Sequence, residues 1–226
     1  MKLQYSELAQ EYSGKNEGYY NLDRGEMLRF VPNDARSVLD IGCSSGGFGK
    51  MIKENRPEVA VFGIEPSEEA AAIARGRLDG VICGIFQDGM VELEGQKFDC
   101  IVFNDVLEHL IKPENALVDA KNYLSETGIV VASIPNILHF YQITKILLEQ
   151  DWKYEDSGIL DNTHLRFFTK KSIVRMFEAC GYRVLKIDGI NPSFGMKYKV
   201  ANAVALGRLV DWKFEQFAVQ AITSKT

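Results

Sequence analysis

The stretch SVLDIGCSSGGFGKM, residues Ser37 to Met51, joins an apolar run to a turn made almost entirely of small residues. Its first part is typical of a buried β-strand that carries one acid, Asp40. The glycines and serines that follow predict a tight turn into a helix beginning near Gly46. Such a turn lets a ligand approach the backbone, and the helix start offers free N–H groups. The alternative is a turn that binds nothing.

Similar apolar runs recur along the chain and alternate with helical patterns. Runs that are almost continuously apolar are typical of parallel strands buried on both faces. Alternating strands and helices predict a doubly wound, mostly parallel α/β sheet with helices on both faces and right-handed crossovers. The predicted strands are 37–41, 59–64, 80–84, 98–103, 128–134, 182–188 and 215–222, and the predicted helices are 46–55, 67–76, 113–124 and 170–180.

The whole chain, residues 1–226, is predicted to be one domain, because no linker, repeat or low-complexity tract interrupts it. Three parts exceed a bare α/β sheet. Residues 1–35 are predicted to be a helical N-terminal segment. The aromatic-containing insertion 136–168 is predicted to form a lid or substrate wall, or else an ordinary helix packed on the sheet. Residues 196–210 are predicted to be an extra amphipathic helix, forming a dimer surface or a pocket roof.

Composition excludes several classes of function. The formal charge of −5 disfavours a nucleic-acid partner, which would need a basic face. No apolar stretch reaches the ~20 residues that cross a bilayer, so no membrane partner is expected. The four cysteines form no CxxC pair, which predicts reduced thiols, no bound metal and a cytoplasmic location. The oligomeric state is left open, a homodimer included.

A second acid, Glu65, ends the second predicted strand and complements Asp40. An acid at that tip can accept hydrogen bonds from both hydroxyls of a ribose, although it could instead cap the next helix. Asp40, beside a helix start, suits a zwitterion: the loop takes the ligand carboxylate and Asp40 faces the ammonium. A ligand with an amino-acid end and a nucleoside end is S-adenosylmethionine. A nicotinamide dinucleotide is disfavoured, because the fingerprint G-x-G-x-x-G requires glycine where Ser44 stands.

The motifs VLDIGCSSGGFG, GIEPS and FDCIVFNDVLEHLIKP resemble the first motifs of class I S-adenosylmethionine-dependent methyltransferases. Residues 160–182 resemble a later motif of the branch that includes ubiquinone-pathway-like O-methyltransferases and enzymes of sugar or polysaccharide gene clusters. The resemblance covers roughly residues 19–190. It implies a seven-stranded sheet of order 3-2-1-4-5-7-6, in which residues 215–222 form the antiparallel seventh strand.

The same resemblance implies which residues bind the cofactor. Asp40, Gly42 and Gly46 match the loop signature, and Glu65 matches the ribose-binding acid. Ser44 replaces a commoner glycine, a change that is tolerable if its φ stays negative.

Two further strand ends complete this cofactor set. Asn104 matches the position whose backbone carbonyl meets the methionine ammonium. Ile85 stands where many members carry an aspartate that bonds the adenine amine. Adenine is therefore expected to contact the backbone near Ile85 and the ring of Phe86, and the amine partner is left open between Gln87 and Asp88.

Candidates for the chemistry are few, because the chain has three histidines. A hydroxyl acceptor must lose a proton as the methyl arrives, and histidine titrates near neutral pH. His164 and His109 are the predicted catalytic residues, with packing or capping roles as their alternatives. Predicted to contact the substrate are Arg166, Tyr141 and Tyr19; for Arg166 an ion pair with Asp161 is the alternative.

The sequence therefore predicts a methyltransferase that acts on a small molecule, most readily by O-methylation. Two alternatives stay open. One is a non-catalytic S-adenosylmethionine-binding or scaffolding protein, and the other, less favoured, is a nicotinamide-dependent oxidoreductase. Nucleic acid is a disfavoured methyl acceptor, since no Asn/Asp-Pro-Pro-aromatic motif follows the fourth strand.

Overall fold

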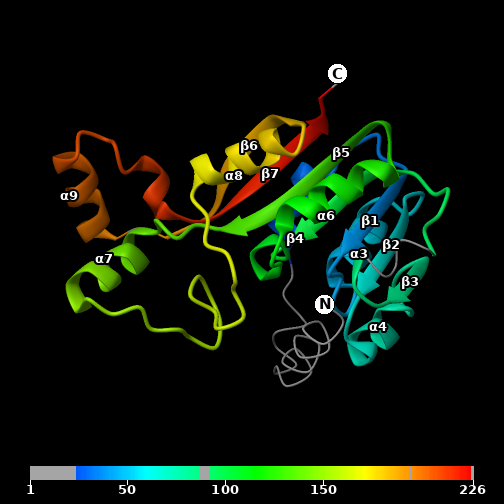
Figure 1. Ribbon diagram of the computed structural model, residues 1–226, viewed down its shortest axis with the longest axis horizontal. Helices are drawn as coiled ribbons and strands as arrows, with labels where there is room; N and C mark the ends of the chain where they lie inside the picture. The colour runs from blue at the N-terminus through cyan, green and yellow to red at the C-terminus, as the bar shows by residue number, and fades with distance from the viewer. Residues whose placement is uncertain (1–23, 87–91, 194, 225–226) are drawn as a thin grey trace.

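A computed structural model describes residues 24–86, 92–193 and 195–224. Its centre is a seven-stranded sheet of order β3-β2-β1-β4-β5-β7-β6 (Figure 1). The pairings among β1 to β5 are parallel, while β7 runs antiparallel to both β5 and β6. The predicted strand order is confirmed.

The first half of the sheet alternates strands and helices as predicted. A short 3-10 helix, η1 (Gly25–Phe30), precedes β1 (Ser37–Ile41). The order then continues with α3 (Gly47–Asn55), β2 (Ala60–Glu65), α4 (Glu68–Ala74) and β3 (Gly80–Cys83). Ser67 caps α4 by accepting a hydrogen bond from the backbone N–H of Ala70, which satisfies one of the free donors at the helix start.

The second half contains the longest strands. It runs from β4 (Phe98–Asn104) through η2 (Leu107–His109), α6 (Pro113–Ala120), η3 (Lys121–Tyr123) and β5 (Leu124–Pro135) to α7 (Phe140–Glu149). It ends with α8 (Lys170–Ala179), β6 (Tyr182–Pro192), α9 (Met196–Val204), η4 (Val210–Lys213) and β7 (Phe214–Thr223).

Alternation along each strand divides the core between the two faces of the sheet. Leu39 and Ile41 of β1 pack in the cluster that contains residues of α6 and α8. Val38 packs on the opposite face, in the cluster that contains residues of η1 and α3. Asp40 shares the face of Val38, and it lies one residue before the end of the strand, where the glycine turn begins.

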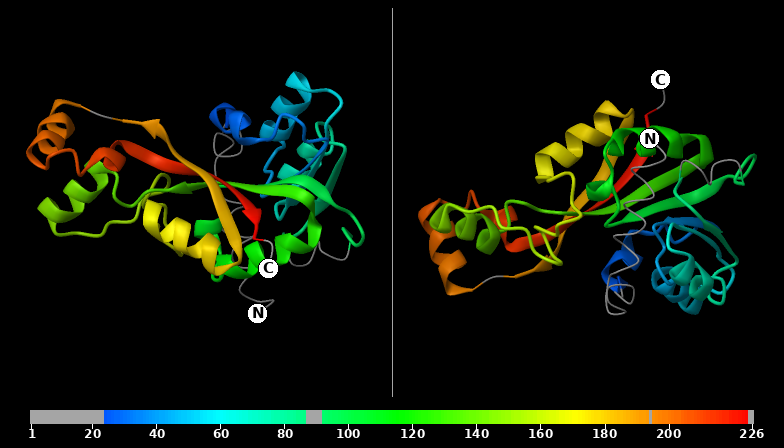
Figure 2. Two further views of the ribbon diagram at one scale, coloured as in Figure 1. Left: turned by 90° about the horizontal axis from the view of Figure 1, so that it is seen from above. Right: turned by 60° about the horizontal axis from the view of Figure 1, so that its bottom comes forward.

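The strands β5, β6 and β7 extend beyond the rest of the sheet and carry α7 and α9 at their far end (Figures 1 and 2). These two helices meet there, with the rings of Phe140 and Tyr198 at 5.6 Å between centroids. The helix predicted over 196–210 ends at Val204, because the chain turns through Leu206 and Gly207, both at positive φ.

Two other predicted segments end differently from their expected bounds or lie partly outside the described residues. The helix predicted over 113–124 ends at Ala120, and its last residues form η3 and the start of β5. Of the predicted N-terminal helical segment, residues 1–23 lie outside the described residues, and the described part contains the single 3-10 helix η1. Within the described residues, no helix combines the length and apolar character needed to cross a membrane.

Candidate active site

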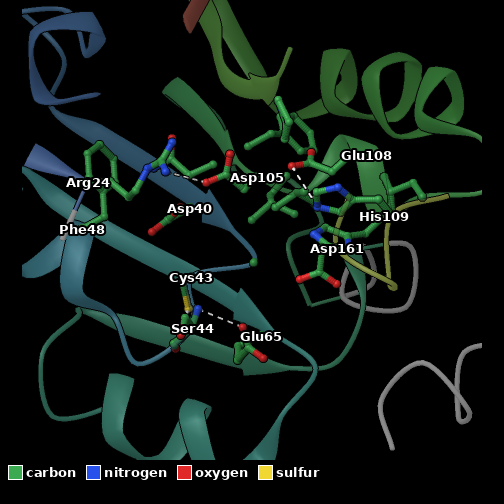
Figure 3. Close-up of a pocket in the computed structure, with 18 of the residues that line it drawn as sticks. Arg24, Asp40, Cys43, Ser44, Phe48, Glu65, Asp105, Glu108, His109 and Asp161 are labelled. Carbon is green, nitrogen blue, oxygen red and sulfur yellow. Dashed lines mark hydrogen bonds and ion pairs between the residues drawn. The ribbon is translucent and has the colours of Figure 1, made fainter. Parts of the chain in front are cut away.

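A cavity of about 530 Å³ opens at the carboxyl ends of β1, β2 and β4 (Figure 3). Its position follows from the topology, because β1 lies between β2 and β4 and the order of the strands reverses there. Ligands of open α/β sheets bind at such a reversal. The volume lies in the range typical of small-molecule sites.

The glycine turn after β1 forms one wall of this cavity. Gly42 and Cys43 donate backbone hydrogen bonds to the carbonyl of Ile64, at 2.8 and 3.1 Å, which ties the turn to β2. Gly42 has φ +71°, and a Cβ at this position would lie 2.7 Å from Cγ2 of Val106. Both the backbone conformation and the space therefore require glycine.

Ser44 does not keep the negative φ on which the tolerance of this change depended, because its φ is +52°. The physical reason is a hydrogen bond: its backbone N–H donates to Oε2 of Glu65 at 2.8 Å. Left-handed backbone costs a non-glycine residue about 1–2 kcal/mol, which this charge-assisted bond offsets.

Glu65 is 6% exposed, at the end of β2. Besides Ser44, it accepts a hydrogen bond at 2.9 Å from the backbone N–H of Ser67, so the capping contact considered as its alternative role is present. Burial raises the pKa of Glu65, and the two backbone donors oppose this rise. A carboxylate offers about four lone-pair sites, so it can accept further hydrogen bonds from a ligand.

Buried polar atoms that lack partners gather around the cavity between β1 and β4. Oδ1 of Asp40 and both side-chain polar atoms of Asn104 have no hydrogen-bond partner among the described residues. Burial, followed by the charge of Glu65, raises the pKa of Asp40 to about 8. Buried polar groups without partners are costly, so these atoms point to a ligand with its own donors and acceptors.

Ile85 and Phe86, predicted to contact adenine, line the same cavity. Phe86 is buried and packs edge-on against the rings of Phe103 and Tyr123. Gln87 and Asp88, between which the amine partner was left open, lie outside the described residues.

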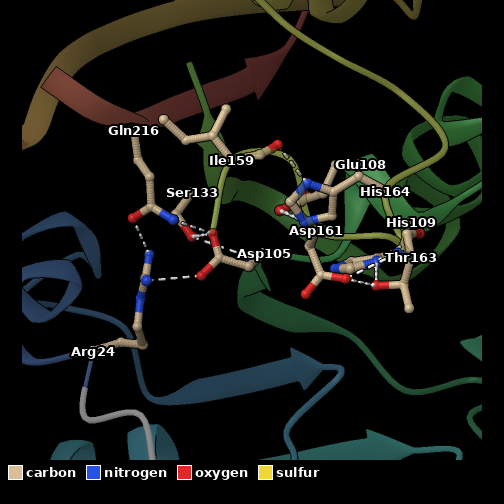
Figure 4. Close-up of polar contacts among 10 residues, drawn as sticks. All are labelled: Arg24, Asp105, Glu108, His109, Ser133, Ile159, Asp161, Thr163, His164 and Gln216. Atoms are coloured by element: carbon tan, nitrogen blue, oxygen red, sulfur yellow. Dashed lines mark hydrogen bonds and ion pairs between the residues drawn. The ribbon is translucent and has the colours of Figure 1, made fainter. Parts of the chain in front are cut away.

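The other end of the cavity holds a cluster of buried ionisable residues (Figure 4). η2 supplies Glu108 and His109, and the loop after α7 supplies His164. The centroids of the two imidazole rings lie 4.7 Å apart. Nδ1 of His164 lies 3.0 Å from the carbonyl oxygen of Ile159, and Nδ1 of His109 lies 3.2 Å from the carbonyl oxygen of Thr163. Both rings are therefore held by backbone groups of one loop.

Glu108 is the member of this cluster whose buried polar atoms have the fewest interactions. It is 1% exposed, and neither carboxylate oxygen has a hydrogen-bond partner among the described residues. Nε2 of His164 lies 4.0 Å from its Oε1. Burial raises the pKa of Glu108 well above its usual range, and the negative charge of Asp105 adds to this effect.

A hydrogen-bonded group that sequence reasoning missed connects the residue before η1 and the residue after β4 with β5 and β7 (Figure 4). Arg24 forms an ion pair of 2.7 Å with Asp105, which also accepts hydrogen bonds from Ser133 and Gln216. No sequence pattern predicts a role for Arg24 or Gln216, since they contact Asp105 only through the tertiary fold. Asp105 and Glu108, in contrast, stand beside the predicted residues in NDVLEH, directly after a strand, and that position was the available signal.

Most of the predicted site residues are brought together, three are not, and one lies outside the described residues. Asp40, Gly42, Glu65, Ile85, Phe86, Asn104, His109 and His164 line the cavity. Gly46 lies outside the lining, where a Cβ would meet Ala74 of α4 at 3.2 Å. Arg166 is exposed and donates to the carbonyl of Ile111 instead of pairing with Asp161, and Tyr141 lies half-exposed on α7. Tyr19 is outside the described residues.

The insertion predicted over 136–168 contributes to the cavity through its second half. The loop after α7 supplies Ser157, Gly158, Ile159, Asp161 and His164 to the lining. The aromatic residues that suggested a substrate wall lie elsewhere: Trp152 packs on Phe167 at 4.9 Å between ring centroids.

This strand order, with buried acids at the tips of β1 and β2, defines the class I S-adenosylmethionine-dependent methyltransferases. The chain belongs to the methyltransferase-domain family, whose model matches residues 15–187. S-adenosylmethionine is accordingly its cofactor.

Individual relatives are distant. An uncharacterized protein of Methanocaldococcus jannaschii is 25% identical over 185 residues, which cover 80% of each chain. The mitochondrial ubiquinone biosynthesis O-methyltransferase of Homo sapiens is 23% identical and covers 76% of this chain and 50% of its own length. The chain spans only 32% of an uncharacterized 37.1 kDa protein of Streptomyces fradiae. A solved S-adenosylmethionine-dependent methyltransferase of Archaeoglobus fulgidus has a TM-score of 0.66, 18% identity and coverage of 96% and 98%, which shows the shared fold.

Proposed function

We propose that this protein transfers the methyl group of S-adenosylmethionine to a hydroxyl oxygen of a small molecule. The observation that carries this proposal is the cavity itself. It joins the unpartnered polar atoms of Asp40 and Asn104, at one end, to the buried cluster of Glu108, His109 and His164, at the other. One side thus suits a polar, nucleoside-bearing cofactor, and the other suits an acceptor that must lose a proton.

The residues present fit the cofactor. Asp40 would face its ammonium, the turn at Gly42 would face its carboxylate, and Glu65 would accept hydrogen bonds from its ribose hydroxyls. Ile85 and Phe86 supply an apolar contact for a flat base. When bound, the cofactor supplies a methyl group already activated by its sulfonium.

His164 is proposed to receive the acceptor proton. A carbonyl oxygen only accepts hydrogen bonds, so the contact with Ile159 places the hydrogen of the neutral imidazole on Nδ1. Nε2 then carries a lone pair on the side that faces Glu108, and the residue lines the cavity. The methyl transfer itself needs alignment and exclusion of water, which the buried lining supplies.

Other functions are less well supported. A scaffolding protein would gain nothing from burying Oδ1 of Asp40 and the polar side-chain atoms of Asn104 and Glu108 without partners among the described residues, at a cost in stability. A nicotinamide cofactor would bring its pyrophosphate close to the carboxylate of Asp40. The name of the human relative, an O-methyltransferase, supports oxygen as the methylated atom.

The proposed function is tested by binding followed by turnover. Calorimetric titration should detect S-adenosylmethionine and S-adenosylhomocysteine but not NAD. Incubation with a panel of phenols, catechols, sugars, carboxylic acids and amines should then give a methylated product by mass only from hydroxyl-bearing members. Tight NAD binding, or methylation confined to amines or carbons, would contradict the proposal.

Replacing Glu65 is expected to weaken cofactor binding. Glu65→Ala should cost about 2–3 kcal/mol of binding free energy, because hydrogen bonds to a charged group are lost. It should also lower the melting temperature, since the N–H groups of Ser44 and Ser67 lose their acceptor. The control is Glu69→Ala on the exposed face of α4. Calorimetric affinity equal to that of the control would show that Glu65 only supports the turn.

Gly42 of the turn and Gly47, the first residue of α3, provide a second matched pair. Gly42→Ala should lower stability by about 1–2 kcal/mol, the cost of left-handed backbone, and should weaken cofactor binding because the added Cβ forces Val106 to move. Gly47→Ala, where no atom of the described residues lies within 4 Å of the added Cβ, should leave stability unchanged or raise it slightly. Equal denaturation midpoints for the two variants would contradict this reading.

A further inference from the structure

We propose that Glu108, His109 and His164 form a binding site for a divalent transition-metal ion. One ligand atom from each residue lies within 4.8 Å of the others, and all three residues are buried in the wall of the cavity. The sequence had predicted no metal, because it contains no CxxC pair; this site uses no cysteine.

The orientation of the two imidazoles supports the proposal. Nδ1 of each ring faces a backbone carbonyl, Ile159 for His164 and Thr163 for His109. The Nδ1 atoms are therefore the donors, and both Nε2 atoms keep their lone pairs. Histidines that bind metal ions in proteins are oriented in this way, by a hydrogen bond from the opposite ring nitrogen. Nε2 of His164 faces Oε1 of Glu108 at 4.0 Å.

The charge of the cluster favours a cation. Glu108 is 1% exposed and has no hydrogen-bond donor among the described residues, and the negative charges of Asp105 and Asp161 act on it. Arg24 pairs with Asp105 and not with Glu108. An ionised carboxylate in this position needs a compensating charge, which a divalent ion bound between Glu108 and the two imidazoles supplies.

The donor atoms select the kind of ion. Two imidazole nitrogens and one carboxylate oxygen suit Zn²⁺, Co²⁺, Fe²⁺ or Mn²⁺, whereas Ca²⁺ and Mg²⁺ prefer oxygen ligands. Ligand atoms around tetrahedral Zn²⁺ lie about 3.3 Å apart, so the three side chains need to draw together by roughly 1 Å. Three protein ligands leave a coordination position open, as in catalytic zinc sites.

The open position gives the ion a role, which rests on the proposed function. A hydroxyl bound to a divalent ion loses its proton far more readily than a free hydroxyl. His164 then acts as a ligand and not as the base. The acceptor proton passes to solvent, the ion stabilises the negative charge left on the acceptor oxygen, and this oxygen takes the methyl group as S-adenosylhomocysteine leaves. The acceptors selected in this way are hydroxyl compounds that coordinate a metal, such as catechols and 2-hydroxy acids.

Binding of the ion is tested with the metal alone. The full-length protein, treated with a chelator and desalted, is titrated with Co²⁺ under reducing conditions. We expect one equivalent per chain, with visible absorption and without the near-ultraviolet band of a cobalt thiolate, which separates this site from the four cysteines. Zn²⁺ should displace the cobalt.

Substitutions test whether the Co²⁺ absorption arises from the proposed site. Glu108→Gln and His164→Asn, which keep side-chain shape or the hydrogen bond to Ile159, should each weaken Co²⁺ binding by more than about 100-fold, beyond the effect of an outer-shell change. His139→Asn, at the histidine bonded to Ser193, is the control and should bind as the parent does. No Co²⁺, Zn²⁺ or Mn²⁺ binding by the folded parent, or binding unchanged in both site variants, would overturn the site.

Failure of the function is distinguishable from failure of the site. Cofactor binding, measured by calorimetry on the chelated protein, should be unaffected. If the ion binds but the loaded protein methylates no hydroxyl compound, the proposed function fails and the metal site stands. If hydroxyl compounds are methylated equally fast in chelator and in Co²⁺ or Zn²⁺, the catalytic role of the ion is overturned.

Discussion

His164→Asn is expected to lower turnover on a hydroxyl acceptor by about 10²–10⁴-fold, the range for loss of a general base, while leaving cofactor affinity nearly unchanged. Asparagine retains a donor where Nδ1 lies, so the hydrogen bond to the carbonyl of Ile159 is kept. Only the Nε2 lone pair, on the side facing Glu108, is removed. The measurement is single-turnover methylation followed by mass.

The control is His139→Asn, because His139 hydrogen-bonds Ser193 and is absent from the cavity lining. Equal turnover by the two variants would remove His164 from the chemistry. The rate against pH separates its two proposed roles. A general base predicts that activity of the variant recovers as the acceptor ionises at high pH, whereas a metal ligand predicts that added Co²⁺ or Zn²⁺ at high concentration restores part of the rate.

Asp40→Asn is expected to stabilise the ligand-free protein at pH 8 and to abolish tight cofactor binding. Burial and the charge of Glu65 raise the pKa of Asp40 to about 8, above its ordinary value of 3.8. Between these pH values the folded state binds more protons than the unfolded state, so stability falls as pH rises. The variant lacks this fall and should be more stable than the parent by about 1–3 kcal/mol at pH 8, with little difference at pH 4.

The matched control is Asp99, for which stability is expected to change with pH in the opposite direction. Partial burial opposes ionisation of Asp99, but hydrogen bonds from Arg36, Ser125 and Ser37 hold the pKa of its carboxyl below the ordinary value. Asp99 therefore contributes stability at neutral pH that is lost as pH falls. Asp99→Asn should be less stable than the parent at pH 8, with the difference disappearing in acid. Urea denaturation at pH 4 and pH 8 measures both, and a parallel response of the two variants would contradict the assignment for Asp40.

Sequence alone determined the sheet and one half of the site. The strand SVLDI and its turn are local features, and every predicted strand is present within a few residues of its expected bounds. Asp40, Glu65 and Asn104 follow from the same logic: each stands at or next to the carboxyl end of a strand, and parallel neighbours bring these ends to one edge.

Only the tertiary structure decided the other half. His109 and His164 are adjacent because the loop after α7 returns over η2, where the backbone N–H groups of Leu165 and Arg166 donate to the carbonyl of Glu108. Arg24 forms its ion pair with Asp105 at the carboxyl end of β4. Ser44 takes a positive φ because its N–H donates a hydrogen bond to Glu65. Each of these depends on contacts between residues distant in sequence, which local propensity and periodicity do not encode, so the acceptor end of the cavity emerges only once the chain has folded.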